Sequence, residues 1–542
     1  MKHVALKMRV LNRWHRTSVA AAALLTMMTL TACGGGGTNS DSDVAQYSPP
    51  AATAQCTVMS DALGSPSTSG AGLATQAANG QIDTLGDRWV VAFTSSEGPF
   101  GTPQQADVDR VLDAFSLAID DRVSPSVLVV KPQPGAAPLQ AKALEADPAV
   151  RYAHPVVPVQ SQQTDVSDQW YLGTAGTTGG TPNDFLGFQA AWAHLDATAA
   201  GKSSILAIVD TGFDLDHSDL AARWLKDSSG SIVQYDFFSG DSDANHGQAN
   251  NTHGTLVAGL AGALHDDEDD LINGTPSNVA GAASGHVKLL PVKVFGDDGL
   301  DVNEQNASAS VQSTLIATAK AIVWLSGGDV SGGPAPLAAD LQADVINLSL
   351  GVETTEDIPL LSDAVQYARS QGVLVVAATG NHDPAIEGTI GGVSGGVFPP
   401  ANAPCAVSVG SLGGDGVVSP FSRYDAASHS VHFMAFGGFR NADVRSNGVT
   451  YLNEYIYNTV TGDGFASRAP GVGTSFSTPV VSAVAAMVAA ANPDLDADGI
   501  LGVMIDAAST ETRLVAGAGT PQVGVGFPCP DAAVGAATKC GQ

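Results

Sequence analysis

Four residues spread along the chain have the side chains that hydrolysis of an acyl bond requires. Ser475 can act as the nucleophile, His253 as its base, Asp210 as the group that orients the base, and Asn381 as a donor to the oxyanion. Asp210 and Asn381 each follow a short apolar run, whereas His253 and Ser475 each begin an apolar segment with a helical pattern. Their types and positions therefore favour a nucleophilic acyl transfer.

Each of these residues also has an ordinary explanation when it is taken alone. An aspartate is common in turns, and a serine before a helix is usually its N-cap. A lone histidine means little in a chain that has 12, and an asparagine after a strand is often a plain loop residue. Together they are more specific, because the order Asp, His, Ser is one of the known chain orders of a catalytic triad. We therefore predict that His253 takes the proton of Ser475 and that Asp210 fixes the imidazole.

The segment from about 203 to 525 has the pattern of an α/β domain. Short runs of β-branched and apolar residues predict strands that are buried on both faces. They lie at 205–209, 287–294, 345–348, 373–378 and 406–409. Helical segments such as 310–325 and 359–370 lie between them. This alternation predicts a mostly parallel sheet flanked by helices, with the site at the carboxyl ends of the strands.

A smaller α+β unit is predicted before this domain, within residues 80–160. Strand-like runs at 88–93, 127–130 and 150–157 alternate with helical patterns at 108–119 and 141–146. Because the last run contains a proline, we predict an edge strand there. The polar segment that follows, 161–168, is the kind of exposed linker in which proteolytic cuts concentrate.

The chain resembles the subtilisin-like serine peptidases in motifs that cover most of its length. The matching segments are 210–212 (Asp-Thr-Gly) with 217–220, 253–255 (His-Gly-Thr) with 257–259, 347–351 (Asn-Leu-Ser-Leu-Gly), the run ending in Gly380-Asn381, and 473–475 (Gly-Thr-Ser) with Pro479. Departures from the family pattern are Leu256, the sequence Phe-Ser-Thr at 476–478, and the polar stretch 426–469, interpreted as a surface insertion.

The resemblance implies roles for further residues. The backbone N–H of Ser475 and the amide of Asn381 would hold the oxyanion. Protein or peptide substrates would bind as an added strand at the positions Ser349, Leu350, Gly351, Ala378, Thr379 and Gly380. Residues 80–160 would be an inhibitory propeptide that occupies the cleft, and 161–542 the catalytic domain, expected to be monomeric. Phe398 would help to wall the first specificity pocket.

The N-terminus predicts export. Basic residues precede the apolar run 19–32, which is too short to span a bilayer and fits a signal peptide. Small residues before Cys33 resemble the lipobox of bacterial lipoproteins, which implies lipidation of Cys33 and an anchor in the outer membrane. The alternative is an ordinary cleaved signal. The predicted divisions are a signal at 1–32 and a flexible tether at 33–79, rich in Gly, Ser, Thr and Ala.

The remaining cysteines fit an exported protein. Besides Cys33 the chain has Cys56, Cys405, Cys529 and Cys540. Export permits disulfides, and Cys529 with Cys540 is the obvious local pair. Four cysteines allow three pairings, however, and the sequence does not choose between them.

The net charge of −30 argues against a nucleic-acid partner, because no basic stripe is present. We expect no cofactor for the chemistry. Structural calcium fits the resemblance, without assigned ligands. The acidic run 494–499 is interpreted as a helix cap rather than a calcium loop, because Ile505 stands where such a loop needs its last carboxylate. A second acidic run, 266–270, predicts a solvated loop or a cation site.

Two other functions are weighed against the peptidase. The sequence Gly-Val-Ser-Gly-Gly at 392–396 matches the nucleophile motif of esterases, in which case Ser394 would react. That motif needs a helix after it, whereas here two prolines follow. The second alternative is a peptide-binding lipoprotein without activity, which would have no need of the triad together with Asn381.

Overall fold

The computed structural model describes the chain in segments. These are residues 87–96, 98–156, 160–161, 186–246, 252–264, 271–272, 275–276, 281–296, 314–382, 393–413, 418–424, 431–438, 456–459, 468–509 and 524–536. Every described residue belongs to one compact unit, which lies within Pro49–Gln542. The predicted signal, Cys33 and the predicted tether lie outside the described residues.

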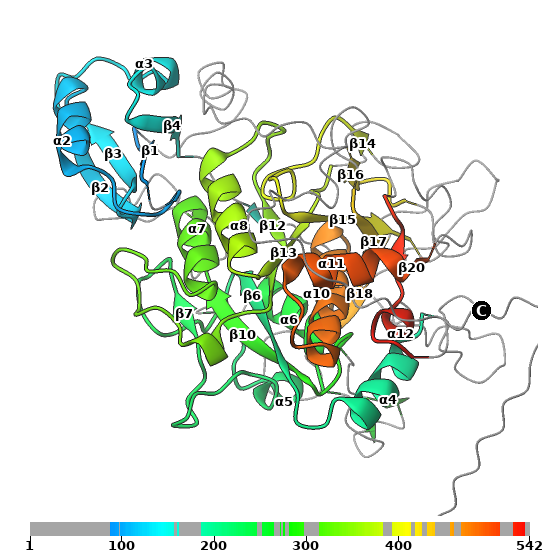
Figure 1. The fold of residues 1–542 in the computed structure, drawn as a ribbon. Helices are drawn as coiled ribbons and strands as arrows, with labels where there is room; N and C mark the ends of the chain where they lie inside the picture. The colour runs from blue at the N-terminus through cyan, green and yellow to red at the C-terminus, as the bar shows by residue number, and fades with distance from the viewer. Residues whose placement is uncertain are drawn as a thin grey trace, which may run out of the picture. The chain divides into compact units, whose positions relative to one another are not determined.

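A seven-stranded parallel sheet forms the centre of the fold (Figure 1). Its strands, in spatial order, are β17 (Phe433–Phe436), β15 (Val407–Leu412), β13 (Leu374–Ala378), β11 (Val345–Leu348), β6 (Ser204–Asp210), β10 (Val287–Lys293) and β7 (Tyr235–Asp236). Every neighbouring pair is parallel. All five strands predicted from apolar runs are present, within a few residues of their expected ends.

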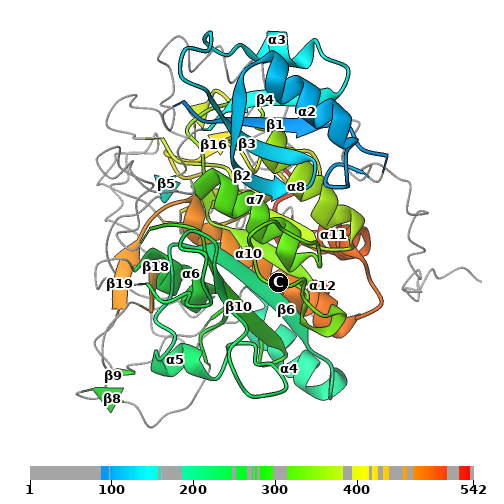
Figure 2. The same ribbon diagram turned by 90° about the vertical axis from the view of Figure 1, so that its left-hand side faces the viewer.

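Helices cover both faces of this sheet (Figures 1 and 2). Alternate residues of a strand point to opposite faces, so each strand contributes to two apolar cores. Leu206 of β6 belongs to the core with α6 (His253–Gly262) and α10 (Thr474–Ala491). Its neighbour Ala207 belongs to the core with α7 (Thr314–Leu325) and α8 (Pro359–Ser370). The parallel sheet flanked by helices was correctly predicted.

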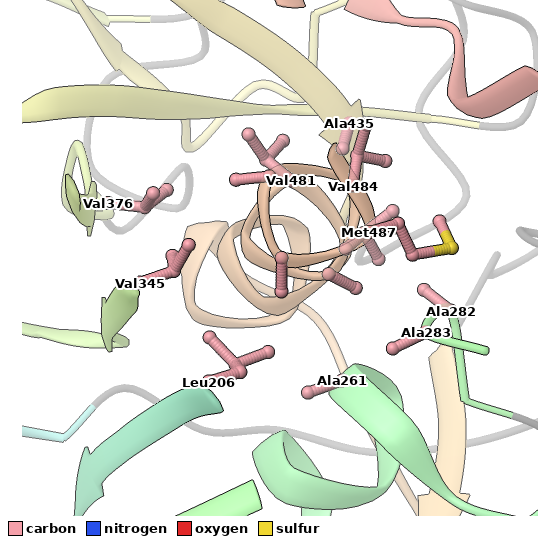
Figure 3. Packing of buried hydrophobic residues seen from close by; sticks show 14 of the residues in the cluster. Leu206, Ala261, Ala282, Ala283, Val345, Val376, Ala435, Val481, Val484 and Met487 are labelled. Carbon is pink, nitrogen blue, oxygen red and sulfur yellow. The ribbon is translucent and has the colours of Figure 1, made fainter. Parts of the chain in front are cut away.

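The helix α10 is the centre of one of these cores (Figure 3). Val481, Val484 and Met487 pack among small and branched residues of the sheet, including Leu206 and Val376. Among the described residues, α10 is the one helix long and apolar enough to cross a membrane, but 94% of it is buried inside the protein. Burial on all sides explains why it carries no polar face.

The remaining elements are short. The helices are α4 (Phe188–Thr198), α5 (Ser218–Ala221), α11 (Ala497–Asp506), α12 (Pro530–Ala533) and a 3-10 turn at Ala339–Leu341. Two-stranded pairs are β8 (Leu271–Ile272) with β9 (Thr275–Pro276), β14 (Val393–Ser394) with β16 (Arg423–Tyr424), β18 (Ile456–Thr459) with β19 (Arg468–Gly471), and β20 (Ala508–Ser509) with β21 (Phe527–Pro528). The stretch 426–469 is therefore not only a surface insertion, because the buried strand β17 lies within it.

Residues 87–156, here called the N-terminal unit, form a separate antiparallel sheet. Its elements are β1 (Trp89–Phe93), α2 (Gln105–Ala114), β2 (Leu117–Ser124), β3 (Val127–Pro132), α3 (Ala141–Glu145) and β4 (Val150–Pro155), with strand order β2-β3-β1-β4. The edge position of β4 confirms the prediction made from Pro155. The helix predicted at 108–119 is present as α2, but it begins earlier and ends at Ala114, and β2 follows.

The N-terminal unit contacts the rest of the chain through α7 and α8. Phe100 packs edge-on against Tyr367 of α8, with 5.5 Å between ring centres. Lys320 of α7, almost wholly buried, donates to both carboxylate oxygens of Asp121 at 3.0 and 3.1 Å. These contacts sit beside an apolar cluster that includes residues of both parts.

Candidate active site

Asp210 and His253 form a buried pair at the carboxyl edge of the sheet. Asp210 is the last residue of β6, and His253 is the first residue of α6. His253 Nδ1 lies 2.7 Å from Asp210 Oδ1, and both side chains are nearly inaccessible to solvent. The backbone N–H of Thr211 donates to the same carboxylate oxygen at 2.7 Å. The carboxylate thus holds the imidazole with Nε2 as the nitrogen left for chemistry.

Gly254 explains how helix and strand come so close. Its N–H donates to Thr211 Oγ1 at 3.1 Å. A Cβ placed on Gly254 would lie 2.3 Å from the carbonyl oxygen of Gly212. Any side chain there would push α6 away from β6, and the contact between Asp210 and His253 would lengthen.

Ser475 lies in the first turn of α10 and is held by Ser349, just after β11. Its Oγ donates to the Ser349 carbonyl oxygen at 3.0 Å, and Ser349 Oγ donates to the Ser475 carbonyl oxygen at 2.7 Å. His253 Nε2 is buried without a hydrogen-bond partner among the described residues. The structure therefore places Ser475 with its hydroxyl turned away from the base. Rotation about χ1 is needed for proton transfer, a common feature of ligand-free sites.

Asn381 follows Gly380, three positions after the end of β13, and is hydrogen-bonded to the start of α10. Its Oδ1 accepts from the backbone N–H of Thr474 at 2.9 Å and from Thr474 Oγ1 at 3.0 Å. Because the amide oxygen is engaged there, the NH₂ group is the part directed elsewhere. A Cβ on Gly473, which has φ +153, would lie 3.1 Å from that nitrogen. Sequence reasoning missed Thr474, although it lies within the serine motif.

The predicted substrate-binding positions lie after two neighbouring strands. Ser349, Leu350 and Gly351 follow β11, and Thr379 and Gly380 follow Ala378 at the end of β13. Phe398 lies against Gly380, because a Cβ there would be 2.3 Å from its ring. The two segments therefore meet at the same edge of the sheet as Asp210, His253 and Ser475.

A short strand at the predicted boundary between the two parts of the chain already pairs with one of these segments. The backbone of β5 (Gln160–Ser161) runs antiparallel to β12 (Leu350–Gly351). Ser161 is opposite Leu350, and Gln160 is opposite Gly351. The edge at β12 thus accepts an added strand, which is the kind of pairing predicted there for a peptide.

Other predicted features have mixed outcomes. Asp496 caps α11 by accepting from the Gly499 N–H at 2.9 Å, as the helix-cap interpretation predicted. Ser394 ends the two-residue strand β14 and no helix follows it, which contradicts the esterase motif.

The metal prediction stays untested. No group of three or more His, Cys, Asp or Glu side chains among the described residues is arranged to hold a metal ion. The acidic run 266–270 lies outside those residues, so the calcium prediction remains open.

The cysteine pairing also stays a prediction. Neither Cys405 nor Cys529 is a free thiol. Cys56 and Cys540 lie outside the described residues.

Comparison with known proteins agrees with the geometry of the site. The profile of the subtilase family matches residues 201–526. The chain therefore belongs to the subtilase family, and its class is that of the subtilisin-like serine proteases. An extracellular protease of Xanthomonas campestris pv. campestris is 28% identical over 403 residues, which are 69% of this chain and 56% of that protein. A thermophilic serine proteinase of a Bacillus species is 29% identical over 71% of this chain and 74% of its own length.

Solved structures show the same fold at lower identity. Fervidolysin from Fervidobacterium pennivorans, described as a keratinolytic enzyme, is 19% identical, with a TM-score of 0.55 over 83% of this chain and 61% of that chain. The epidermin leader peptide processing protease of Staphylococcus aureus is also 19% identical, with a TM-score of 0.52 over 83% of this chain and 98% of that chain. These likenesses concern the fold alone.

Proposed function

We propose that the protein is a serine endopeptidase that hydrolyses peptide bonds in proteins through an acyl-enzyme. The observation that carries this proposal is the buried contact between Asp210 and His253, 2.7 Å long, at the sheet edge to which Ser475 and Asn381 also come. A buried carboxylate on one imidazole nitrogen, with the other unengaged, is the arrangement that activates a serine.

The proposed reaction uses each residue in one role. Ser475 Oγ turns from the Ser349 carbonyl and attacks the substrate carbonyl carbon, while His253 Nε2 accepts its proton. Asp210 stabilises the imidazolium that forms. The Asn381 amide and the Ser475 N–H donate to the oxyanion. His253 then protonates the leaving amine, and water hydrolyses the acyl-enzyme by the same route in reverse.

The N-terminal unit is proposed to be an inhibitory propeptide. Two features support this role: it packs on α7 and α8 through a buried ion pair, and the strand that follows it occupies the edge at β12. A substrate strand would need that same edge. The uncut chain would therefore be inactive toward other proteins.

Export with a lipid anchor at Cys33 is part of the proposal. The relatives from Xanthomonas and from Natrialba magadii are both named as extracellular proteases, which supports export. The signal at 1–32 and the lipobox resemblance support the anchor. Labelling cells with a radioactive fatty acid, with Cys33→Ser as the control, tests it: label on both chains or on neither would contradict a Cys33 anchor.

Casein hydrolysis tests the activity after each chain has been treated with trypsin, which can cut the N-terminal unit at its lysines and arginines and so open the site, and the trypsin has been removed. We expect wild type and Ser394→Ala to be active. Ser475→Ala should lose about 10⁶ in turnover, a magnitude measured on subtilisin. The binding-protein alternative predicts no hydrolysis by any of the three. The esterase alternative predicts that the loss follows Ser394.

A further inference from the structure

Phe398 and Pro399 bridge the two segments that border the site, 349–351 and 378–380. The backbone N–H of Phe398 donates to the Thr379 carbonyl oxygen at 3.0 Å, and the Val352 N–H donates to the Pro399 carbonyl oxygen at 3.0 Å. The chain at 398–399 is therefore hydrogen-bonded to the end of one segment and to the residue after the other.

The side chain of Phe398 lies between one glycine of each segment. A Cβ on Gly380 would lie 2.3 Å from Cδ2 of the ring, and a Cβ on Gly351 would lie 3.7 Å from the Phe398 Cβ. Phe398 itself is only 7% exposed. The space that the two glycines leave by lacking a side chain is thus already filled by the phenylalanine.

Arg423 of β16 holds the ring in this position. Its guanidinium carbon lies 4.2 Å from the centre of the Phe398 ring, which is within the range of a cation–π contact. The Arg423 Nε donates to the Gly396 carbonyl oxygen at 2.9 Å, and its backbone N–H donates to the Gly380 carbonyl oxygen at 3.2 Å. With an edge against Gly380 and a face under a buried guanidinium, the ring has little freedom to swing aside.

The reacting residue of a substrate has to come to this place. Its carbonyl carbon must reach Ser475 Oγ, which is hydrogen-bonded to the Ser349 carbonyl, and its carbonyl oxygen must reach the amide of Asn381. Its α-carbon then lies between the segments 349–351 and 378–380, and its side chain enters the space beside Phe398.

We infer that Phe398, held by Arg423, restricts the acyl side of the cut bond to residues with small side chains, such as alanine, serine and glycine. Protein interiors are close-packed, so extra carbon atoms in a space that is already filled force side chains from their preferred rotamers. This inference rests on the proposed peptidase function and names the substrate class of that site.

Two peptide substrates test the inference on the wild type after trypsin has opened the site and has been removed. They are succinyl-Ala-Ala-Pro p-nitroanilides that carry either alanine or phenylalanine next to the anilide. We expect kcat/KM to be at least about tenfold higher for the alanine peptide. The ratio of the two values does not depend on how much of the protein is folded. A smaller ratio, or a preference for phenylalanine, would overturn the inference.

Replacement of the ring tests the role of Phe398. Phe398→Ala should raise kcat/KM for the phenylalanine peptide, relative to the alanine peptide, at least about tenfold. The matched control is Phe238→Ala, because Phe238 is a second phenylalanine beside a cation, 6.0 Å from Lys293 Nζ. The control should keep the wild-type ratio. Equal ratios in the two variants would contradict the role of Phe398.

Arg423 is expected to act through the ring and not on the substrate. Arg423→Met loses the cation and its donors, so the ratio should shift in the same direction as in Phe398→Ala, but less. In the Phe398→Ala background the same substitution should add nothing, because the ring that it frees is gone. An equal shift in both backgrounds would contradict this coupling.

Casein separates failure of this inference from failure of the peptidase proposal. If the wild type degrades casein and Ser475→Ala does not, but the phenylalanine peptide is cut as well as the alanine peptide, the peptidase proposal stands and the restriction by Phe398 is wrong. If the wild type cuts neither casein nor the peptides, both are wrong.

Discussion

At the scale of single residues, the site combines a fixed base with a nucleophile that still has to turn. The two serines 475 and 349 exchange hydrogen bonds through their hydroxyls and carbonyls at 3.0 and 2.7 Å. The triad residues could be predicted from sequence because each stands in a short local motif. The orientation of the Ser475 hydroxyl could not, because its partner is 126 positions away.

Thr474 is expected to act as a positioning residue for the oxyanion donor. Its hydroxyl accepts from the Gly380 N–H at 3.2 Å and donates to Asn381 Oδ1 at 3.0 Å. Thr474→Val keeps the shape but removes the hydroxyl, so Asn381 loses part of its orientation. We expect kcat to fall about tenfold, below the 10²–10³ that loss of a whole oxyanion donor costs in subtilisin.

Kinetics on a peptide substrate measure this effect. KM should change little in Thr474→Val, and Thr474→Ser should restore kcat, because serine keeps the hydroxyl. A fall in kcat that serine does not rescue would indicate a packing role instead.

At the scale of elements, strands with buried, β-branched sequences were predictable and partly exposed ones were not. The run 345–348 coincides with β11, because three of its four residues are apolar and two of these are β-branched, which suits a strand buried on both faces. By contrast β2 has three exposed residues in a row and two bulges, so its buried and exposed residues do not alternate regularly. Ser116, with φ 51, ends the helical path just before it.

Loss of either partner of the ion pair between β2 and α7 should lower the free energy of unfolding, but by unequal amounts. The side chain of Lys320 is 1% exposed, whereas that of Asp121 is 27% exposed. Asp121→Asn leaves a buried ammonium without its counter-charge, while Lys320→Met leaves a carboxylate that can reach water. We expect Asp121→Asn to lose about 3 kcal/mol of unfolding free energy and Lys320→Met clearly less.

Urea denaturation of both variants in a Ser475→Ala background measures this difference without self-cleavage. Asp107→Asn, at an exposed pair with Arg110, is the control and should lose less than about 1 kcal/mol. Equal losses in the two test variants would contradict the burial argument.

His154 of β4 should make the stability of the N-terminal unit depend on pH. Its side chain is fully buried and Nδ1 donates to the Pro155 carbonyl at 2.8 Å, with Nε2 lacking a partner among the described residues. Burial lowers the pKa of His154 to about 4. The folded unit therefore binds the proton less well than the unfolded chain, and its stability falls as pH drops from 6.5 toward 4, by up to about 3 kcal/mol.

Comparison with His154→Phe isolates this effect, because Asp357 acts in the opposite direction. Burial raises the pKa of Asp357 to about 6, so the folded state gains stability as that carboxyl protonates. Both chains are measured in the Ser475→Ala background. Between pH 7 and pH 4.5, the urea midpoint should fall further for the chain that keeps His154 than for His154→Phe. Parallel changes would contradict the assignment to His154.

At the scale of the whole molecule, the order of the parts could be predicted but their contacts could not. Composition and pattern separate the N-terminal unit from the α/β domain. The pair of Lys320 and Asp121 spans 199 positions and leaves no periodic signal in the sequence. The strand β5 lies in a polar linker that predicts only exposure.

Cleavage between about 159 and 170 would divide the anchor from the catalytic domain, and a disulfide from Cys56 would keep them together. Without Cys56, the part of the chain after the cut has three cysteines, Cys405, Cys529 and Cys540, an odd number in an oxidising compartment. We expect the two fragments to separate on a gel only with reductant, and Cys56→Ser to separate without it. Separation of the wild type without reductant would show that maturation frees the catalytic domain.

The most direct test of the central claim is labelling by a fluorophosphonate, which forms a covalent bond with an activated serine. After trypsin has opened the site, peptide mapping should find the label on Ser475. The label should be absent from His253→Ala, because the serine is then not activated. Label on Ser394, or equal labelling of the His253→Ala chain, would contradict the assignment of the triad.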